Sequence, residues 1–273
     1  VLNCGDNNLK NLSLVNMVEL KRLYCYSNEL ISLDMSSNPE LTYICGYFNN
    51  LESIEITENP KLRTLIIHSN NLTSLDVTKN PYLTILSCLY NEITSLDVSN
   101  NPLLTTLNCA YNNIETLDAS NKPDLVNLQC GFNDLSSLNI AGASSLKTLN
   151  CFFNQLTTLN VNDSPGLTYL NCQKNQIVSL DVSNNKDLVT FYCPDNKLIH
   201  IDVTNNVALE IFYPSQNQLT SLDLSNNSLL TKMISQHNPY LTCIQVNQTQ
   251  LGKIPSDWYK DGHASYSLNC NET

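Results

Sequence analysis

Hydrophobic residues recur along this chain with a constant period of 21 residues. If the first leucine of each period is numbered position 1, leucine holds that position in eleven successive periods without an insertion: Leu20, Leu41, Leu62, Leu83, Leu104, Leu125, Leu146, Leu167, Leu188, Leu209 and Leu230. A fixed period of this length is typical of a solenoid, in which each repeat packs only on its neighbours.

Two short alternations within each period predict two short strands. Apolar positions 4 and 6 alternate with polar positions 3, 5 and 7, which is the period of a strand with one buried face. A second alternation, Leu96-Asp97-Val98 in one repeat, predicts an extended segment on the opposite wall. The joining SNNP and TKNP sequences are turn formers. The pattern therefore predicts a mainly β solenoid with one parallel sheet and about twelve repeats, over residues 1–246.

The periodicity ends near residue 247, and residues 247–273 are predicted to form a C-terminal cap. At the other end, Leu2 and Cys4 match positions 4 and 6, so the chain enters the pattern in the middle of a repeat. The sequence shows no polar cap there to cover the exposed strand edge. We therefore expect the chain to be a fragment of a longer protein.

Asparagine is the most constant residue of the repeat, at position 9. An Asn amide donates and accepts at once, so it can bind the backbone groups of adjacent turns where the chain leaves the sheet. The alternative is a row of asparagines that reads a ligand. The row comprises Asn7, Asn28, Asn49, Asn70, Asn91, Asn112, Asn133, Asn154, Asn175, Asn196, Asn217 and Asn238.

Eight of the 11 cysteines lie in phase at position 6. Parallel side chains that point into a core do not offer the torsion of a disulfide, and a column of single cysteines without phased histidines cannot gather four zinc ligands. We predict free, buried thiols for Cys4, Cys25, Cys88, Cys109, Cys130, Cys151, Cys172 and Cys193. Cys45 has the phase of an outward residue and is the odd thiol.

Together these positions spell LxxLxLxxNxL, the pattern of the leucine-rich repeat. Cysteine at the sixth residue and the LDVSNNP second half resemble the 21-residue cysteine-ladder repeats of an internalin-type bacterial surface adhesin. The resemblance implies a right-handed solenoid with a concave sheet, a secreted or cell-surface location, and binding as the function. It also implies an oxidising compartment, in which Cys243 and Cys270, both outside the ladder, would form a disulfide.

Charge and hydropathy restrict the partners. The formal net charge is -11 and the sequence pI about 4.6, which disfavours nucleic acid and anionic lipid as partners. No segment has the length of apolar sequence needed to cross a bilayer. We expect a monomer that requires no cofactor.

No set of residues predicts catalysis. His68, His200, His237 and His263 fall in repeats or walls too far apart to meet, and no phosphate-binding loop is present. The acids at position 15, such as Asp97 and Asp118, form a column that could attract Ca²⁺. The other interpretation, which we favour, is that each acid accepts N–H bonds from its own turn. The chain is predicted not to be an enzyme and to hold no metal.

Aromatic residues supply the candidate binding site. The outward positions 3, 5, 7 and 8 of the predicted sheet hold most of the Tyr and Phe residues, and such surfaces often bind partners. The site residues are Tyr90, Tyr111, Phe132, Phe153, Phe152, Phe48, Tyr47, Tyr43, Tyr26 and Tyr24. We predict a macromolecular ligand, with protein first. The alternatives are a glycan, a passive spacer without a ligand, or rings that merely stabilise the sheet.

Overall fold

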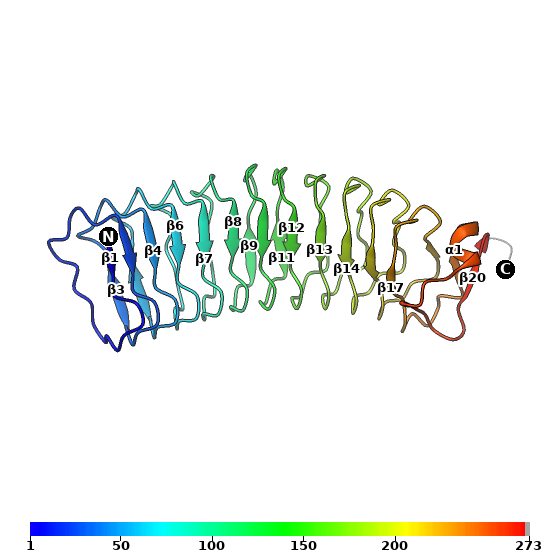
Figure 1. Cartoon of the computed structure of the whole chain (residues 1–273), viewed down its shortest axis with the longest axis horizontal. Helices are drawn as coiled ribbons and strands as arrows, with labels where there is room; N and C mark the ends of the chain where they lie inside the picture. Colours follow the sequence, from blue (N-terminus) through cyan, green and yellow to red (C-terminus); the bar gives the residue numbers. More distant parts are fainter. Residues whose placement is uncertain (271–273) are drawn as a thin grey trace. The chain divides into compact units, whose positions relative to one another are not determined.

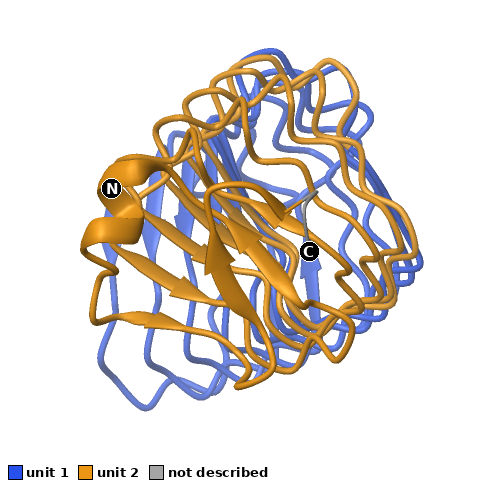
Figure 2. Cartoon of the chain, turned by 90° about the vertical axis from the view of Figure 1, so that its right-hand side faces the viewer, with its two compact units in different colours: residues 1–139 blue, residues 140–273 orange. Residues whose placement is uncertain are grey.

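The computed structural model describes residues 1–270 and divides the chain into two compact units, Val1–Asn139 and Ile140–Thr273 (Figure 2). Each unit is a parallel β-solenoid in which one turn of chain corresponds to one repeat, and helix is nearly absent (Figure 1). The predicted mainly β solenoid is confirmed. The last three residues of the predicted cap, 271–273, lie outside the described part of the chain.

The main sheet of the first unit contains one strand from each repeat. Its strands pair in parallel with an offset of one period, as in Leu86 beside Leu107. In order these are β1 (Leu2–Asn3), β2 (Arg22–Tyr24), β4 (Tyr43–Cys45), β6 (Thr64–Ile66), β7 (Ile85–Ser87), β8 (Thr106–Asn108) and β10 (Asn127–Gln129). The opposite wall carries the predicted second segments as β3 (Ser32–Asp34), β5 (Ser53–Glu55), β9 (Thr116–Asp118) and β11 (Ser137–Asn139).

The second unit repeats this arrangement and ends in a cap. Its main-sheet strands are β12 (Thr148–Asn150), β13 (Tyr169–Asn171), β14 (Thr190–Tyr192), β15 (Ile211–Tyr213), β17 (Lys232–Ile234) and β19 (Trp258–Tyr259). The opposite wall has β16 (Leu222–Asp223), β18 (Cys243–Gln245) and β20 (Ser265–Ser267), and the cap includes the helix α1 (Gln248–Gly252). The Cys243–Cys270 disulfide, with Cα atoms 5.7 Å apart, joins β18 to the segment predicted as the cap.

The core of each repeat consists of the apolar positions that the period identifies. In one repeat Leu104, Leu107, Cys109 and Ile114 are each fully buried. Burying a side chain of this size stabilises the fold by about 1.5–3 kcal/mol. Because every repeat adds the same set, the core grows with the number of repeats and needs no helix.

The position-9 asparagines form the predicted ladder between turns. The Asn112 Nδ2 donates to the backbone oxygens of Cys88 (3.1 Å), Cys109 (3.1 Å) and Ala110 (3.2 Å). Its Oδ1 accepts from the Ile93 N–H at 3.0 Å. Both ends of the buried amide are satisfied, so the scaffold interpretation is confirmed for this row.

A second buried asparagine row, at position 19, was not recognised from the sequence, where it looked like ordinary turn chemistry. Asn101 is fully buried, and its Nδ2 donates at 2.9 Å to the backbone oxygens of both Val77 and Asn80. Unlike the first row, its Oδ1 has no hydrogen-bond partner. These asparagines therefore satisfy carbonyl groups of the preceding repeat and leave their own oxygen unsatisfied.

Lys122 replaces asparagine in this second row. Its side chain is 1% exposed, and its Nζ donates to the Val98 oxygen at 2.8 Å, the equivalent of the carbonyl that Asn101 binds one repeat earlier. Burial lowers the pKa of Lys122, partly offset by the charges of Asp118 and Asp97. A lysine can occupy an asparagine position here because it presents a donor to the same acceptor.

The ladder thiols are free, and all except Cys4 are buried. Cys45 corrects the sequence-based expectation. Although its phase points it outward, it is only 5% exposed, and it interacts with the neighbouring Tyr43 hydroxyl. Large side chains on this face cover it, so a residue at an outward position is not necessarily accessible.

This burial predicts the pattern of thiol alkylation. Desolvation raises the pKa of Cys25 to about 12. It also raises the pKa of Cys4, but Cys4 is partly exposed and therefore accessible to reagent. Since the thiolate is the reactive form, iodoacetamide at pH 8 should modify Cys4 alone in the folded protein and nine cysteines after unfolding in urea, as counted by mass spectrometry. Rapid native labelling of Cys109 would contradict the buried ladder.

Candidate binding face

Three of the predicted residues form a continuous stack on the main sheet of the first unit. The rings of Tyr90 and Tyr111 lie 4.2 Å apart with an interplanar angle of 21°, and those of Tyr111 and Phe132 lie 4.3 Å apart at 17°. Burial and a hydrogen bond with Tyr90 raise the pKa of the Tyr111 hydroxyl. We call Tyr90, Tyr111 and Phe132 the aromatic ladder.

A second aromatic cluster occupies the N-terminal strands of the same unit. Tyr26, Tyr47 and His68 stack in turn, with centroids 5.0 and 4.7 Å apart. Phe48 meets Tyr47 edge to face at 5.4 Å. His68 was considered on the sequence only as a candidate catalytic residue. Burial lowers its pKa, so the imidazole stacks as a neutral ring at neutral pH. His68 and Tyr47 both occupy position 7 of the repeat, and this shared position was the sequence signal that could have placed His68 in the cluster.

The remaining predicted residues form further aromatic pairs within each unit. Tyr24 and Tyr43 pack together at 5.0 Å beside the second cluster. Phe152 and Phe153 belong to the second unit, where their rings meet edge to face at 5.6 Å and the Lys174 Nζ lies 4.4 Å from the Phe153 centroid. The structure thus groups the ten residues into clusters within each unit.

The aromatic surface is less exposed than the sequence suggested. Phe48 and Tyr90 are 58% and 49% exposed, whereas the other eight predicted residues are half-buried. Each ring covers part of the next, so stacking removes area that a single aromatic residue would leave in water. Tyr111 presents mainly its edge to solvent, because Tyr90 and Phe132 cover its two faces.

Position 8, which holds all three ladder residues, has a left-handed backbone in every repeat. The φ angles lie between 51° and 62°, a region that Gly and Asn tolerate far better than bulky residues. At this point the chain turns out of the sheet. The residues are Asp6, Ser27, Phe48, Ser69, Tyr90, Tyr111, Phe132, Phe153, Lys174, Asp195, Gln216 and His237.

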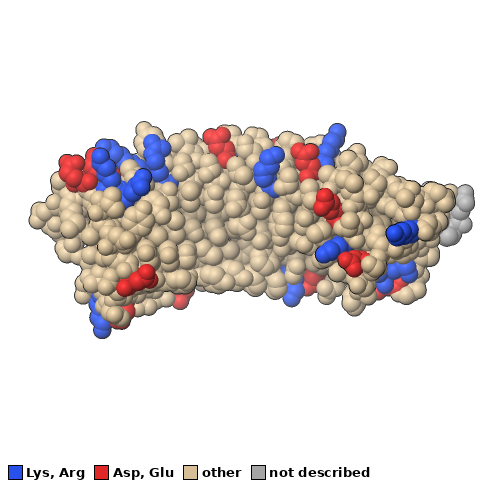
Figure 3. Space-filling model, in the orientation of Figure 1, with Lys and Arg blue, Asp and Glu red and all other residues tan. Residues whose placement is uncertain are grey.

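The sheet face around the ladder carries no formal charge. From Tyr24 to Phe132, positions 3, 5, 7 and 8 contain no Lys, Arg, Asp or Glu, although the protein as a whole is strongly acidic. Figure 3 shows the contrast, with few charged side chains in the middle of the view and Lys and Arg gathered along one edge near the N-terminal end. A neutral, partly apolar face of this kind suits an uncharged ligand surface.

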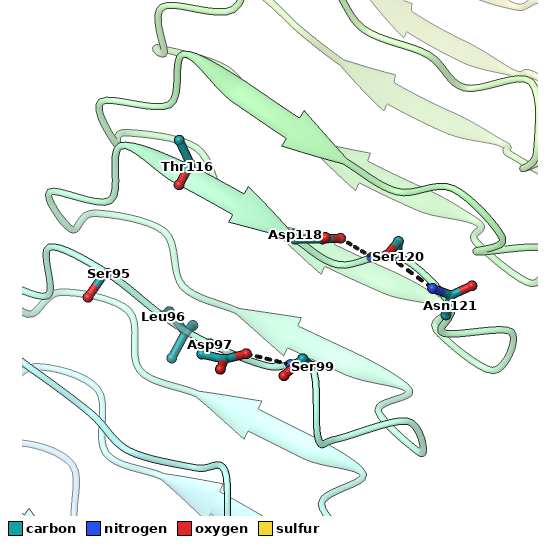
Figure 4. A pocket seen from close by; sticks show the side chains of 8 residues that line it. All are labelled: Ser95, Leu96, Asp97, Ser99, Thr116, Asp118, Ser120 and Asn121. Atoms are coloured by element: carbon teal, nitrogen blue, oxygen red, sulfur yellow. Dashed lines mark hydrogen bonds between the residues drawn. The ribbon is translucent and has the colours of Figure 1, made fainter.

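A cleft of about 590 Å³ lies on the opposite wall (Figure 4). Its lining includes Asp97 and Asp118, two of the position-15 acids that were considered as a possible Ca²⁺ site. Asp97 accepts from the Ser99 N–H at 2.8 Å, and Asp118 from the Ser120 N–H at 2.9 Å. Hydrogen bonds from the Ser99 and Ser120 side chains, and then those from the two N–H groups, lower the pKa of both carboxyls. The turn interpretation of these acids is confirmed. In residues 1–270, no three His, Cys, Asp or Glu side chains are arranged to hold a metal ion.

Comparison with known proteins gives structural matches only. No protein-family model and no curated protein sequence matches the chain. The functional domain of InlJ from Listeria monocytogenes, which includes a cysteine ladder, matches with a TM-score of 0.77 and 32% identity over 92% of this chain. The chain covers 58% of that domain. The resemblance to internalin-type cysteine-ladder repeats is thus confirmed.

Two further structures match at the level of the fold. An internalin, inlF, from Listeria monocytogenes matches with a TM-score of 0.71 and 22% identity, over 96% of this chain and 80% of its own. TLR13, solved in complex with ssRNA13, matches with a TM-score of 0.58 and 16% identity, over 92% and 47%. Within residues 1–270, no helix has the length and apolarity to span a bilayer.

Proposed function

We propose that this leucine-rich repeat protein, whose cysteine-ladder repeats resemble those of an internalin, is a non-catalytic recognition module that binds another protein through the outer face of its main sheet. We place it outside the cell, secreted or displayed on a bacterial surface. The likeness to the InlJ domain and the Cys243–Cys270 disulfide support that location. The aromatic ladder of the first unit is the proposed centre of the site.

The observation that carries this proposal is the presence of aromatic residues at a left-handed backbone position. Placing a bulky residue there costs about 1–2 kcal/mol relative to glycine. The turn does not require it, since Ser69, Lys174 and Asp195 occupy the same position in other repeats. Stacking of an aromatic pair stabilises the fold by only about 0.5–1.5 kcal/mol. Aromatic residues concentrated where they are not needed for folding, on a charge-free face, are better explained by binding.

The ring geometry favours a protein over a glycan. A sugar ring stacks on an aromatic face, but the faces of Tyr111 are occupied by Tyr90 and Phe132. The nearby amides are also partly engaged, since the Gln129 Nε2 donates to the Asn127 Oδ1 at 2.7 Å. Exposed ring edges and tyrosine hydroxyls can instead pack against aliphatic and aromatic side chains and bind backbone carbonyls.

Replacing two ladder residues by asparagine separates binding from stability. Asparagine accepts the left-handed conformation, so Tyr111→Asn combined with Phe132→Asn should change the free energy of unfolding by no more than about 1 kcal/mol. The same variant should lose at least tenfold in affinity for its ligand, corresponding to about 1.4 kcal/mol or more. Binding is measured on an array of purified extracellular proteins and printed glycans.

The control is Tyr240→Asn, which removes an aromatic side chain that is 63% exposed in a turn outside the main sheet. It should bind as the unmodified chain does. Ladder-dependent binding to glycans alone would favour the glycan-binding alternative. Undiminished binding of the double variant would place the binding site away from the ladder. No binding by the intact chain would leave the passive spacer as the better interpretation. A large loss of stability would assign the rings a structural role.

A further inference from the structure

We propose that the ligand of the first unit is electrically polarised, with basic groups on the side facing the ends of the main-sheet strands, acidic groups on the opposite side, and an uncharged apolar centre. This inference rests on the proposed function, because it describes the partner of the same face. It follows from the charges along the two long edges of the main sheet of residues 1–139, whose positions 3, 5, 7 and 8 are uncharged from Tyr24 to Phe132.

The edge that follows the strands is acidic. Exposed Glu92 and Asp134 come two residues after Tyr90 and Phe132, so they border the aromatic ladder directly. Lys10 offsets one acid of this edge by pairing with Glu29 at 3.8 Å. The acidic residues between the strands and the opposite wall are Glu29, Glu52, Glu92, Glu115 and Asp134. A ligand that covers the ladder would also lie against several of these negative charges. This favours basic side chains on that part of the ligand.

The edge that precedes the strands is basic where it adjoins the sheet. Lys21, Arg22 and Arg63 are exposed there, at positions 2 and 3, and these positions contain no acid from Lys21 to Phe132. Two residues before position 2, at position 21, the charges are mixed: Glu40 pairs with Lys61, and Glu19 is exposed. The basic edge at the strand starts thus extends from Lys21 to Arg63, and positions 2 and 3 of the later repeats of this unit are uncharged. The acidic edge on the other side runs from Glu29 to Asp134.

The second unit lacks this order and so provides an internal comparison. The segments that follow its strands carry exposed Lys174 and Lys197 and no acid at positions 10 and 12, whereas its strand starts hold Lys147, Glu210 and Lys232. The polarity is thus a feature of the unit that contains the aromatic ladder and not a property of the repeat. At about 3.3 Å per residue, an extended segment of roughly six to eight residues would span the sheet from one edge to the other.

Selection of peptides tests the inference without knowledge of the natural partner. Phage-displayed random peptides of about 12 residues, long enough to cross the sheet, are selected on the intact chain. Enriched peptides should have an apolar uncharged centre, Lys or Arg at one end and Asp or Glu at the other. On Glu92→Lys combined with Asp134→Lys, they should bind at least tenfold more weakly, and raised salt should weaken their binding to the unmodified chain.

Matched variants identify which idea fails. Lys197→Glu reverses an exposed charge in the second unit and should leave peptide affinity unchanged. A variant that combines Arg22→Glu and Arg63→Glu with Glu92→Lys and Asp134→Lys should select peptides with the opposite order of charges. Enriched peptides without charge order, or with an order that the variants do not alter, overturn the inference while leaving the proposed function intact. No enrichment, or enrichment that survives Tyr111→Asn with Phe132→Asn, overturns both.

Discussion

Raising the pH above about 9 should destabilise this protein steeply, and the transition should be complete near pH 10–11. The cause is the column of buried thiols. Desolvation raises the pKa of Cys109 and Cys151 to about 12, and that of Cys88 and Cys172 well above its ordinary value. In the unfolded chain the same thiols ionise near 9.0. The folded state alone therefore resists losing these protons.

The sign follows from proton binding. Below pH ~9 both states hold the thiol protons, so the stabilisation is fully present; between ~9 and the folded pKa the unfolded state has released protons that the folded state retains. Stability then falls as pH rises, by about 1.4 kcal/mol per pH unit for each thiol. Several thiols acting together would exhaust the ~5–15 kcal/mol of a typical domain within one or two pH units.

Urea unfolding followed by circular dichroism between pH 7 and 10.5, under reducing conditions, measures this slope. Cys109→Val keeps the core apolar but removes one titrating group, so it should reduce the slope by about 1.4 kcal/mol per pH unit. Cys4→Val, at a partly exposed position, should reduce it less. An identical slope for Cys109→Val and the unmodified chain would show that the ladder thiols do not govern alkaline unfolding.

Asn112→Leu should cost about 4 kcal/mol or more of stability. Leucine leaves the buried Ile93 N–H without its partner, which costs about 1–3 kcal/mol. The Cys88, Cys109 and Ala110 carbonyls lose one hydrogen bond each, worth about 0.5–1.5 kcal/mol, and keep the Asn91 amide, the Asn133 amide and the Tyr90 N–H as donors. The urea midpoint and hydrogen exchange of the neighbouring repeats measure the loss.

Two variants calibrate this result. Asn113→Leu changes the adjacent exposed residue and should be nearly neutral. Asn101→Leu, in the second row, should cost less than Asn112→Leu, because it removes two donated bonds and relieves an unsatisfied oxygen. If Asn112→Leu matched Asn113→Leu in stability, position 9 would have to be conserved along the chain for a reason other than its hydrogen bonds.

Periodicity made the fold and the core predictable, because every repeat of a solenoid adopts the same local structure. Each position of the repeat could therefore be compared across many repeats. Leu107, Cys109 and Asn112 were assigned correctly from position alone. Position 19 was missed because Asn-Pro sequences are typical of exposed turns, and nothing in the sequence distinguishes an asparagine that points inward. Lys122 was hidden for the same reason, since lysine is rarely fully buried.

The binding face was harder to predict because it depends on how side chains pack with one another. Phase correctly placed Tyr90, Tyr111 and Phe132 on adjacent turns. It could not show that their rings stack, which depends on side-chain torsions, nor that Cys45 is covered by its neighbours. The left-handed backbone at position 8 was also invisible, because the residues there are chemically diverse and few of them prefer that conformation.

The two asparagine rows also limit how such a chain can change in length. Asn112 binds a carbonyl 24 residues back in the sequence and an N–H 19 residues back, and Asn101 binds a carbonyl 21 residues back. Inserting or deleting a few residues within a turn would misalign these contacts in the adjacent turn. Gain or loss of one whole 21-residue repeat preserves every such contact, so recombination between repeats can lengthen or shorten the array in whole steps and still yield a folded protein.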